Sequence, residues 1–172
     1  MEIIEADEQH VAEMQKIYAY HVKHGTASFE TEPPSVAEMA ARLKKIKDAG
    51  LLWLVVLHEG EVKGYCYLGR YRERYAYRHT LEDSIYIAPG FQKRGAGKAL
   101  LRRAVDWAEM QGFRQLIGNV GDSQNQASIQ LHLAAGFSVT GTLKSVGFKH
   151  GRWLDTVFMQ RPLGDGDQTP PE

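Results

Sequence analysis

The stretch from Ser84 to Met110 constrains the fold more than any other part of this chain. Residues Ser84 to Ile87 alternate small, apolar and aromatic side chains, which is typical of a short β-strand. Pro89 and Gly90 end that strand, and an amphipathic helix is predicted to begin at Gly97. Its apolar stripe consists of Leu100, Leu101, Ala104, Val105 and Ala108.

The loop between this strand and helix has the composition of an anion-binding site. It reads Gln-Lys-Arg-Gly-Ala-Gly over residues 92–97. Unpartnered N–H groups and the positive end of the dipole lie at a helix start, and glycine lets a phosphate approach the backbone. A Walker loop would need Ser or Thr at Ala99, and a dinucleotide fingerprint would need glycine at Leu100. An ordinary strand–helix connection would also be satisfied by the glycines alone.

Three further blocks give the loop a context. The order Gln92-x-x-Gly95-x-Gly97 resembles the pyrophosphate loop of the GNAT acyl-CoA N-acyltransferases. Asn125, His132 and the segment Ala135–Phe137 lie where that family has an asparagine, a helix and a Gly-Phe turn. The resemblance spans nearly the whole chain and is greatest to the phosphinothricin and methionine-sulfoximine acetyltransferase branch. The most specific stretches are 29–33, 77–87 and 146–153.

Composition places the chain among ordinary globular proteins. Its 172 residues suit one domain, and 43% hydrophobic content allows a real core. Basic and acidic residues balance at 21 each, so neither nucleic acid nor membrane is an expected partner. The single cysteine, Cys66, fits a reducing compartment, and no signal peptide or membrane span is expected, which predicts a cytoplasmic protein. No metal site is expected.

The predicted elements follow the order β-α-α-β-β-β-α-β-α-β-β. This order matches the fold that the resemblance implies, an α/β fold with a central mixed, mainly antiparallel sheet flanked by helices. The acetyltransferase domain is expected over residues 1–163, with a disordered tail over 164–172. The expected strands are 2–5, 51–58, 62–68, 84–87, 115–120, 137–140 and 153–160. The expected helices begin at Asp7, Ser35, Gly97 and Gln126.

The resemblance implies acetyl-CoA as cosubstrate. Backbone N–H groups of the strand before the loop are expected to meet the pantetheine arm and the thioester carbonyl, where donors to a developing oxyanion contribute strongly to catalysis. Asn125 is expected either to bind the pantetheine or to cap the following helix. The expected cofactor-binding residues are Ile85, Tyr86, Ile87, Lys93, Arg94, Gly95, Ala96, Gly97, Lys98 and Asn125.

By the same resemblance, Glu82 and His132 occupy catalytic positions. Glu82 corresponds to the glutamate proposed as general base, and a carboxylate beside an apolar strand can have its pKa raised toward a useful range. His132 stands where many relatives carry a tyrosine that protonates the departing thiolate, and histidine can act as acid or base near neutrality. From the residues alone, Glu82 is also explained as a solvated residue at a strand start, and His132 as a packed or surface residue.

The acceptor is expected to be a small amino acid with an oxygen-rich side chain. Arginine forks suit carboxylate and phosphinate groups, and the residues expected to bind the acceptor are Arg72, Glu73, Arg74, Glu82, Asp83 and Ser84. Lys149, His150 and Arg152 add cations from a second loop. A homodimer is expected, because two-fold pairing is the commonest oligomer and the resemblance implies it, and Lys149 to Trp153 would then complete a neighbour's site. The alternatives are acetylation of a protein N-terminus or another small amine, and a CoA-binding module without turnover.

Overall fold

The computed structural model describes residues 1–172. The strands and the longer helices follow the predicted order, and two short 3-10 turns are added. The elements are β1 (Glu2–Glu5), η1 (Glu8–His10), α1 (Val11–His24), α2 (Val36–Asp48), β2 (Trp53–His58), β3 (Glu61–Arg70), η2 (Tyr75–Tyr77), β4 (Thr80–Ile87), α3 (Ala96–Met110), β5 (Gln115–Gly121), α4 (Gln126–Ala134), β6 (Ser138–Lys149) and β7 (Arg152–Pro162).

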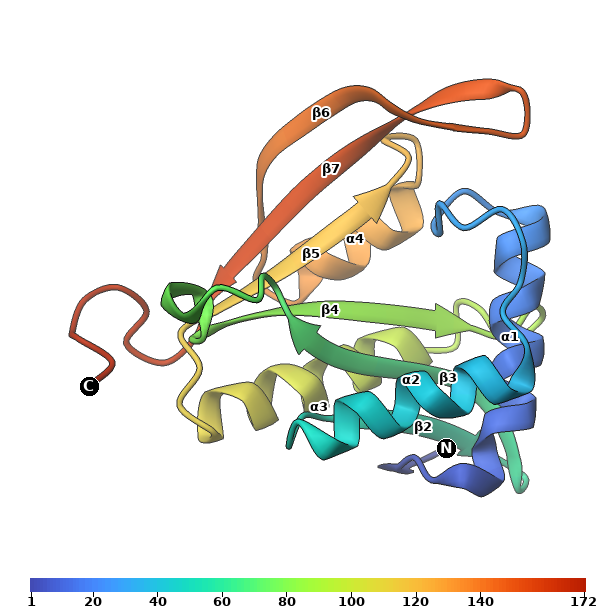
Figure 1. The fold of residues 1–172 in the computed structure, drawn as a ribbon, viewed down its shortest axis with the longest axis horizontal. Helices are drawn as coiled ribbons and strands as arrows, with labels where there is room; N and C mark the ends of the chain where they lie inside the picture. Colours follow the sequence, from blue (N-terminus) through green and yellow to red (C-terminus); the bar gives the residue numbers. More distant parts are fainter.

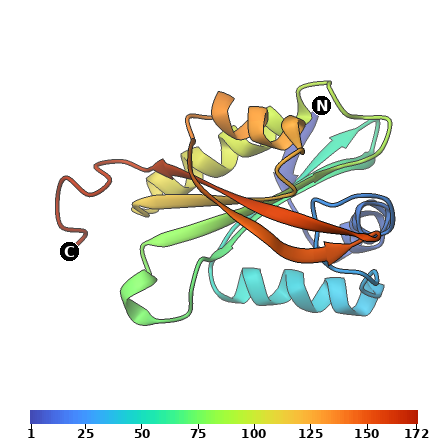
Figure 2. The same ribbon diagram turned by 90° about the horizontal axis from the view of Figure 1, so that it is seen from above.

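A single 7-stranded sheet runs through the molecule in the order β1-β2-β3-β4-β5-β7-β6. Every neighbouring pair is antiparallel except β4 and β5, which are parallel. Helices α1 and α2 cover one face of the sheet, and α3 and α4 cover the other (Figure 2). The predicted fold class, a mixed and mainly antiparallel sheet flanked by helices, is therefore confirmed.

Each face of the sheet has its own hydrophobic core. The core under α3 contains 19 buried residues and the core under α1 and α2 contains 12. Because side chains alternate along a strand, β4 sends Leu81 into the first core and Tyr86 against the second. The predicted stripe of α3 is confirmed, since all of its members are buried in the first core: Leu100, Leu101, Ala104, Val105 and Ala108.

The parallel strands β4 and β5 pair over only half of their length. Thr80 to Asp83 lies beside Gln115 to Gly118, and no pair follows. Beyond this point β4 continues beside β3, whereas β5 continues beside β7 (Figure 1). We call the point of divergence, at Asp83 and Gly118, the fork. The second half of β4 therefore has no strand on one side, which leaves backbone N–H groups there without a strand partner.

Several predicted strand limits were wrong. The strand predicted over 84–87 begins at Thr80, because pairing with β3 and β5 overrides the low strand preference of Glu82 and Asp83. The strand predicted over 137–140 extends to Lys149, so most of the loop expected before the last strand is itself strand. Register shifts at residues 139–141 and 143–147 interrupt the alternation of side chains, which hid this length in the sequence.

The C-terminal segment 164–172 contains no helix or strand. The guanidinium of Arg114 donates to the carbonyl oxygens of Gly166, Thr169 and Pro170 at 2.7–3.1 Å. Arg78 binds the carboxylate of Glu172 at 2.8 Å. These contacts hold the segment against the start of β5, and its disorder in solution stays a prediction. No helix combines the length and the apolar character that a membrane crossing requires.

Candidate active site

The loop before α3 presents unpartnered backbone donors. Gly95, the N-cap residue, has φ 84°, and no side chain caps the helix. Lys93, two residues earlier, also has a positive φ of 62°. Left-handed residues alternating with ordinary ones turn successive N–H groups toward one concave side, which favours an anion. The loop thus has the backbone geometry of a phosphate site.

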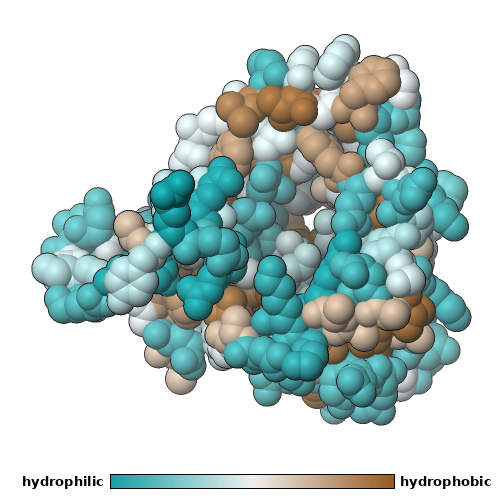
Figure 3. All heavy atoms as spheres, viewed as in Figure 1, coloured by the Kyte–Doolittle hydropathy of each residue, from teal (hydrophilic) through white to brown (hydrophobic).

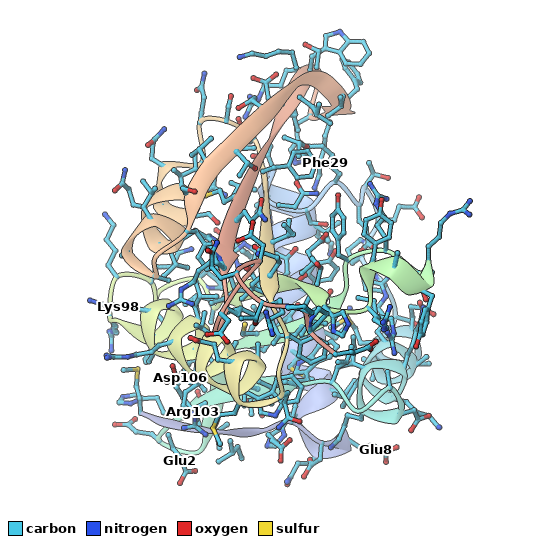
Figure 4. All side chains as sticks on the ribbon, turned by 90° about the vertical axis from the view of Figure 1, so that its left-hand side faces the viewer. Glu2, Glu8, Phe29, Lys98, Arg103 and Asp106 are labelled. Carbon is cyan, nitrogen blue, oxygen red and sulfur yellow. The ribbon has the colours of Figure 1, made fainter.

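Charged side chains surround these donors. Lys93, Arg94 and Lys98 are exposed, and Figure 4 shows Lys98 directed outward from the start of α3. The guanidinium of Arg94 lies 4.9 Å from the ring centre of Phe91, and Phe91 is itself buried. Phe91 therefore anchors the loop in the core while the cations stay available. Ala96 is buried and contributes its backbone only.

The second half of β4 directs backbone groups away from β3. The carbonyl oxygen of Ile87 lies 2.7 Å from Nε2 of His21, which belongs to α1 and not to the sheet. In an antiparallel strand the N–H and C=O of one residue point to the same side, and alternate residues share that side. Ile85 and Ile87 therefore direct their N–H groups into the fork, whereas Tyr86 directs its own toward β3. Two of the three expected donors are suitably oriented.

A cavity of about 260 Å³ opens beside the fork. Its walls come from β4, the end of β5, α4 and the loop 25–30, and the surface is hollowed between the β6–β7 hairpin and the helices below (Figure 3). The predicted residues that line it are Glu82, Asp83, Ser84, Ile85, Tyr86, Asn125 and His132. The sheet topology thus brings predicted catalytic, cofactor-binding and acceptor-binding residues together at one cavity.

Glu82 of β4 is one of the titratable groups that line this cavity. Burial, followed by the negative charge of Asp83, raises the pKa of Glu82, and Arg72 partly offsets that shift. A carboxylate with a raised pKa is a stronger base than an ordinary glutamate, because it gains more by accepting a proton. Arg72 also stacks on Tyr71, with the guanidinium 5.0 Å from the ring centre.

Asp83 and His132 form a buried pair. Nε2 of His132 lies 2.9 Å and 3.1 Å from the two carboxylate oxygens of Asp83, and Nδ1 lies 2.8 Å from the carbonyl oxygen of Ser128. Burial alone would lower the pKa of His132, but the charge and hydrogen bonds of Asp83, with the Ser128 carbonyl, outweigh burial and raise it. Both ring nitrogens are thus bonded inside the protein. The predicted acid role of His132 at the thiolate is not favoured by this geometry.

Asn125 caps helix α4. Its side-chain oxygen accepts the N–H of Ser128 at 3.3 Å, so capping, one of the two predicted roles, is present. Asn125 also lines the cavity. Because the cap occupies its oxygen, the side-chain amide N–H groups are the part of Asn125 that remains for a ligand.

The β6–β7 turn closes over the loop 25–30 within the same chain. Nζ of Lys149 donates to the carbonyl oxygen of Ser28 at 2.7 Å, and Lys149 is only 4% exposed. Phe29 lies beneath the hairpin (Figure 4), and a Cβ at Gly147 would come within 2.5 Å of its ring. Lys149 was predicted as a free cation for an acceptor, but burial and this hydrogen bond make it a structural residue.

A carboxylate that the sequence did not indicate completes this closure. Oδ2 of Asp122 accepts from Thr26 and from Arg152, each at 2.8 Å. Asp122 is 6% exposed and has a positive φ of 76°. Ser28, Asn119 and Thr156 also line the cavity unexpectedly. Of these residues, Asn119 could have been noticed in the sequence, because it is a polar residue within the run Leu116–Val120 of β5.

The structure separates the predicted acceptor-binding residues Arg72, Glu73 and Arg74 into two places. Arg72 acts on Glu82 at the cavity, as its effect on the pKa of that carboxyl shows. Glu73, Arg74 and Arg78 instead line a second hollow between η2 and the end of α3, together with Glu172. Of the two arginines predicted to bind the acceptor, only Arg72 thus lies beside the cavity. Substrate binding by Glu73 and Arg74 stays a prediction.

Cys66 is fully buried in the core beneath α3, and burial raises the pKa of its thiol well above the ordinary value. It therefore packs and does not act as a nucleophile. No group of three or more His, Cys, Asp and Glu side chains is arranged to hold a metal ion.

Comparison with known proteins identifies the family. Residues 14–137 match the sequence model of the acetyltransferase (GNAT) family. The phosphinothricin N-acetyltransferase of Alcaligenes faecalis is 57% identical over 156 residues, covering 91% of this chain and 79% of the relative. The L-methionine sulfoximine/L-methionine sulfone acetyltransferase of Salmonella typhimurium is 36% identical over 160 residues, covering 93% of each chain.

A solved structure has nearly the same fold. The phosphinothricin acetyltransferase of Sinorhizobium meliloti, in complex with acetyl-CoA, superposes with a TM-score of 0.97 at 45% identity. The superposition covers 99% of this chain and 92% of that protein. The predicted resemblance is therefore confirmed.

Proposed function

This chain belongs to the acetyltransferase (GNAT) family, and we propose that it transfers the acetyl group of acetyl-CoA to the amino group of phosphinothricin, methionine sulfoximine or methionine sulfone. One observation carries the proposal. A single strand, β4, presents the carboxylate of Glu82, leaves N–H groups free beyond the fork, and leads directly into the anion loop. Acceptor, thioester and phosphates are thereby aligned along one element.

The donor half of the reaction uses backbone groups. The pyrophosphate of acetyl-CoA would be held by the N–H groups at the start of α3 and by the nearby cations Lys93 and Lys98. The pantetheine arm would enter the fork beside Ile85 and Ile87. When the amine attacks the thioester carbonyl, the carbonyl oxygen becomes negative, and these fixed donors stabilise it without reorganising.

Glu82 would act as the base. The acceptor amine reaches the cavity largely protonated, since an α-amino group titrates near pH ~8 even at a chain terminus, above neutral pH. Glu82 takes one proton from the ammonium, directly or through water, and passes it to solvent, so that the neutral amine can attack the thioester carbonyl. The C–N bond forms, the C–S bond breaks, and the nitrogen loses its second proton. The thiolate of CoA then gains one proton, so the products are the N-acetylated amino acid and CoA with a free thiol.

Size and polarity of the cavity favour a small acceptor. A volume of about 260 Å³ suits a single amino acid better than a peptide chain. The wall carries hydroxyl and amide groups on Ser28, Ser84, Asn119 and Thr156, and Arg72 lies nearby. Relatives that act on phosphinothricin, methionine sulfoximine and methionine sulfone support the oxygen-rich class of side chain.

The test is release of the CoA thiol over a panel of acceptors. We expect turnover of phosphinothricin, methionine sulfoximine and methionine sulfone, and much slower turnover of methionine, because polar groups of the site lose partners when the oxygens are missing. Equal rates for methionine and its sulfone would contradict the acceptor class. If only peptides or polyamines were turned over, the acceptor would belong to a different class. If no amine caused thiol release, the chain would be a CoA-binding module without turnover.

We further propose that the chain forms a homodimer through the β6–β7 hairpin. Strand β6 is an edge strand, and five large apolar side chains of the hairpin are at least half exposed (Figure 3): Val139, Leu143, Val146, Phe148 and Trp153. Exposed apolar groups gathered on one edge are typical of an interface.

Light scattering tests the dimer. We expect twice the chain mass for the unmodified protein, the chain mass for Phe148→Arg, and no change for Met110→Arg, which alters an even more exposed apolar residue on α3. A chain mass for the unmodified protein at micromolar concentration would exclude the dimer. We also propose a cytoplasmic location, which the free thiol of Cys66 fits and cell fractionation tests.

A further inference from the structure

The buried pair of Asp83 and His132 has no direct place in acetyl transfer as described. The side chains expose only 2% and 3% of their surfaces. Both ring nitrogens of His132 are hydrogen-bonded within the protein, and the ring packs edge-on against Phe137, with centres 4.9 Å apart. A ring held on three sides does not swing toward a thioester. The pair therefore either affects the reaction indirectly, through neighbouring residues, or stabilises only the fold.

The hydrogen bonds fix where protons lie. A carbonyl oxygen only accepts, so Nδ1 of His132 must carry a proton to bind the Ser128 carbonyl. A second proton must lie between Nε2 and the carboxylate of Asp83, because two lone pairs facing each other would repel. The short contacts to both carboxylate oxygens fit a charged ring against a charged carboxylate. The pair is thus neutral as a whole but polarised, with its negative end on β4.

The pair lies at the fork, where β4 and β5 diverge. Asp83 is the last β4 residue paired with β5, directly before the strands diverge. The ring of His132 lies over Gly118, where a Cβ would come within 2.7 Å of it. His132 also lies on α4, the helix that Asn125 caps. The pair therefore joins α4 to β4 at the fork, one residue from Glu82.

We propose that Asp83 and His132 are positioning residues that set the charge beside Glu82. In this arrangement the positive ring of His132 offsets part of the negative charge of Asp83. Asp83 therefore raises the proton affinity of Glu82 less than an uncompensated carboxylate would. The inference rests on the proposed role of Glu82 as base and deepens it. It assigns no proton transfer to His132 itself.

Other charged and titratable groups around the pair are few. Cys66 of β3 faces Asp83, and the charge of Asp83 adds to burial in raising the pKa of that thiol. Around Glu82 the remaining neighbours are Arg72 from the β3–β4 loop and Tyr67 from β3. Each is left unchanged in the variants below, so a shift in the pH profile can be attributed to the pair.

Two variants should move the pH profile in opposite directions. Asp83→Asn removes the negative neighbour, so the acidic limb of kcat/KM should move to lower pH. His132→Gln keeps a donor for Asp83 but removes the positive charge, so the limb should move to higher pH. Each shift is expected to be about half a pH unit or more. The double variant should lie close to Asp83→Asn, since little charge is left to compensate.

A purely structural pair gives a different result. Both single variants would then lose activity at every pH without moving the limb. Shifts of the same sign, or no shift in either variant, overturn the proposal. Acetyl-CoA affinity by calorimetry serves as the folding control, since the anion loop and the N–H groups of Ile85 and Ile87 are untouched.

Nitrogen NMR of the unmodified protein tests the pair without any assay of turnover. In the full chain with labelled histidine, the His132 ring should keep both nitrogens protonated between about pH 6 and 8, while exposed histidines titrate. In Asp83→Asn the same ring should become neutral, with its proton on Nδ1. A His132 ring that loses the Nε2 proton in that range in the unmodified protein overturns the proposal. Because this readout needs no acceptor, its failure is distinct from failure of the proposed acetyl transfer.

Discussion

Gly118→Ala is expected to destabilise the fold strongly although it adds only one methyl group. Gly118 is buried on β5 beside Asp83, and an added Cβ would lie 2.7 Å and 2.8 Å from two ring atoms of His132. The optimum separation of carbon atoms is about 3.5 Å, so the ring would have to move by roughly 0.8 Å. The ring cannot retreat freely, because Asp83, the Ser128 carbonyl and Phe137 hold it.

The free energy of unfolding should fall accordingly. Overpacking a filled interior costs about 1–3 kcal/mol, and stretching a buried charge-assisted hydrogen bond costs about 1.5–3 kcal/mol. We expect a loss of about 3 kcal/mol, which for a domain of this size lowers Tm by about 6–12 °C. Thermal unfolding followed by circular dichroism measures this loss.

Gly141→Ala is the matched control. Gly141 lies on β6 with a negative or extended φ, and no atom lies within 4 Å of an added Cβ. Its stability should change by less than about 1 kcal/mol. A further check is His132→Ala, which removes the ring, so that Gly118→Ala added to it should cost little more. If Gly118→Ala were as stable as Gly141→Ala, the close contact of the ring with β5 would be refuted.

The remaining predictions concern the site and the C-terminal segment. Glu82→Gln should lower kcat/KM at neutral pH by on the order of 10²-fold, with partial recovery at higher pH as the free amine increases; in the unmodified enzyme the acidic limb should lie above the ordinary glutamate pKa, because the pKa of Glu82 is raised. Arg72→Ala should raise the acceptor KM more than Arg74→Ala does, and equal effects would contradict the separation of the two arginines. Gly97→Val should weaken acetyl-CoA binding by at least tenfold, or ~1.4 kcal/mol, in calorimetry, and unchanged affinity with an intact fold would exclude the anion loop. Arg114→Ala should speed proteolysis within residues 164–172, because its guanidinium holds that segment; an unchanged cleavage rate would show that those contacts do not restrain it.

The element order and the anion loop could be predicted from the sequence because both are local. A strand that alternates side chains, a glycine at a left-handed position and an apolar stripe at helical spacing each involve residues a few positions apart. The buried stripe of α3 and the left-handed Gly95 illustrate this. The position of Glu82 followed from resemblance to a family, since its chemistry depends on a cavity that no local pattern reveals.

Only the tertiary structure decided which of these residues meet. His132 and Asp83 are 49 positions apart, and Lys149 and Ser28 are 121 apart. A histidine that pairs with a carboxylate and a histidine that faces a substrate look alike in sequence, and so do a lysine that binds an acceptor and one that binds a carbonyl. The difference lies in burial and in the partner, which the fork between β4 and β5 and the closing β6–β7 hairpin supply. Sequence determined the available chemical groups, and the sheet determined which of them remain free to react.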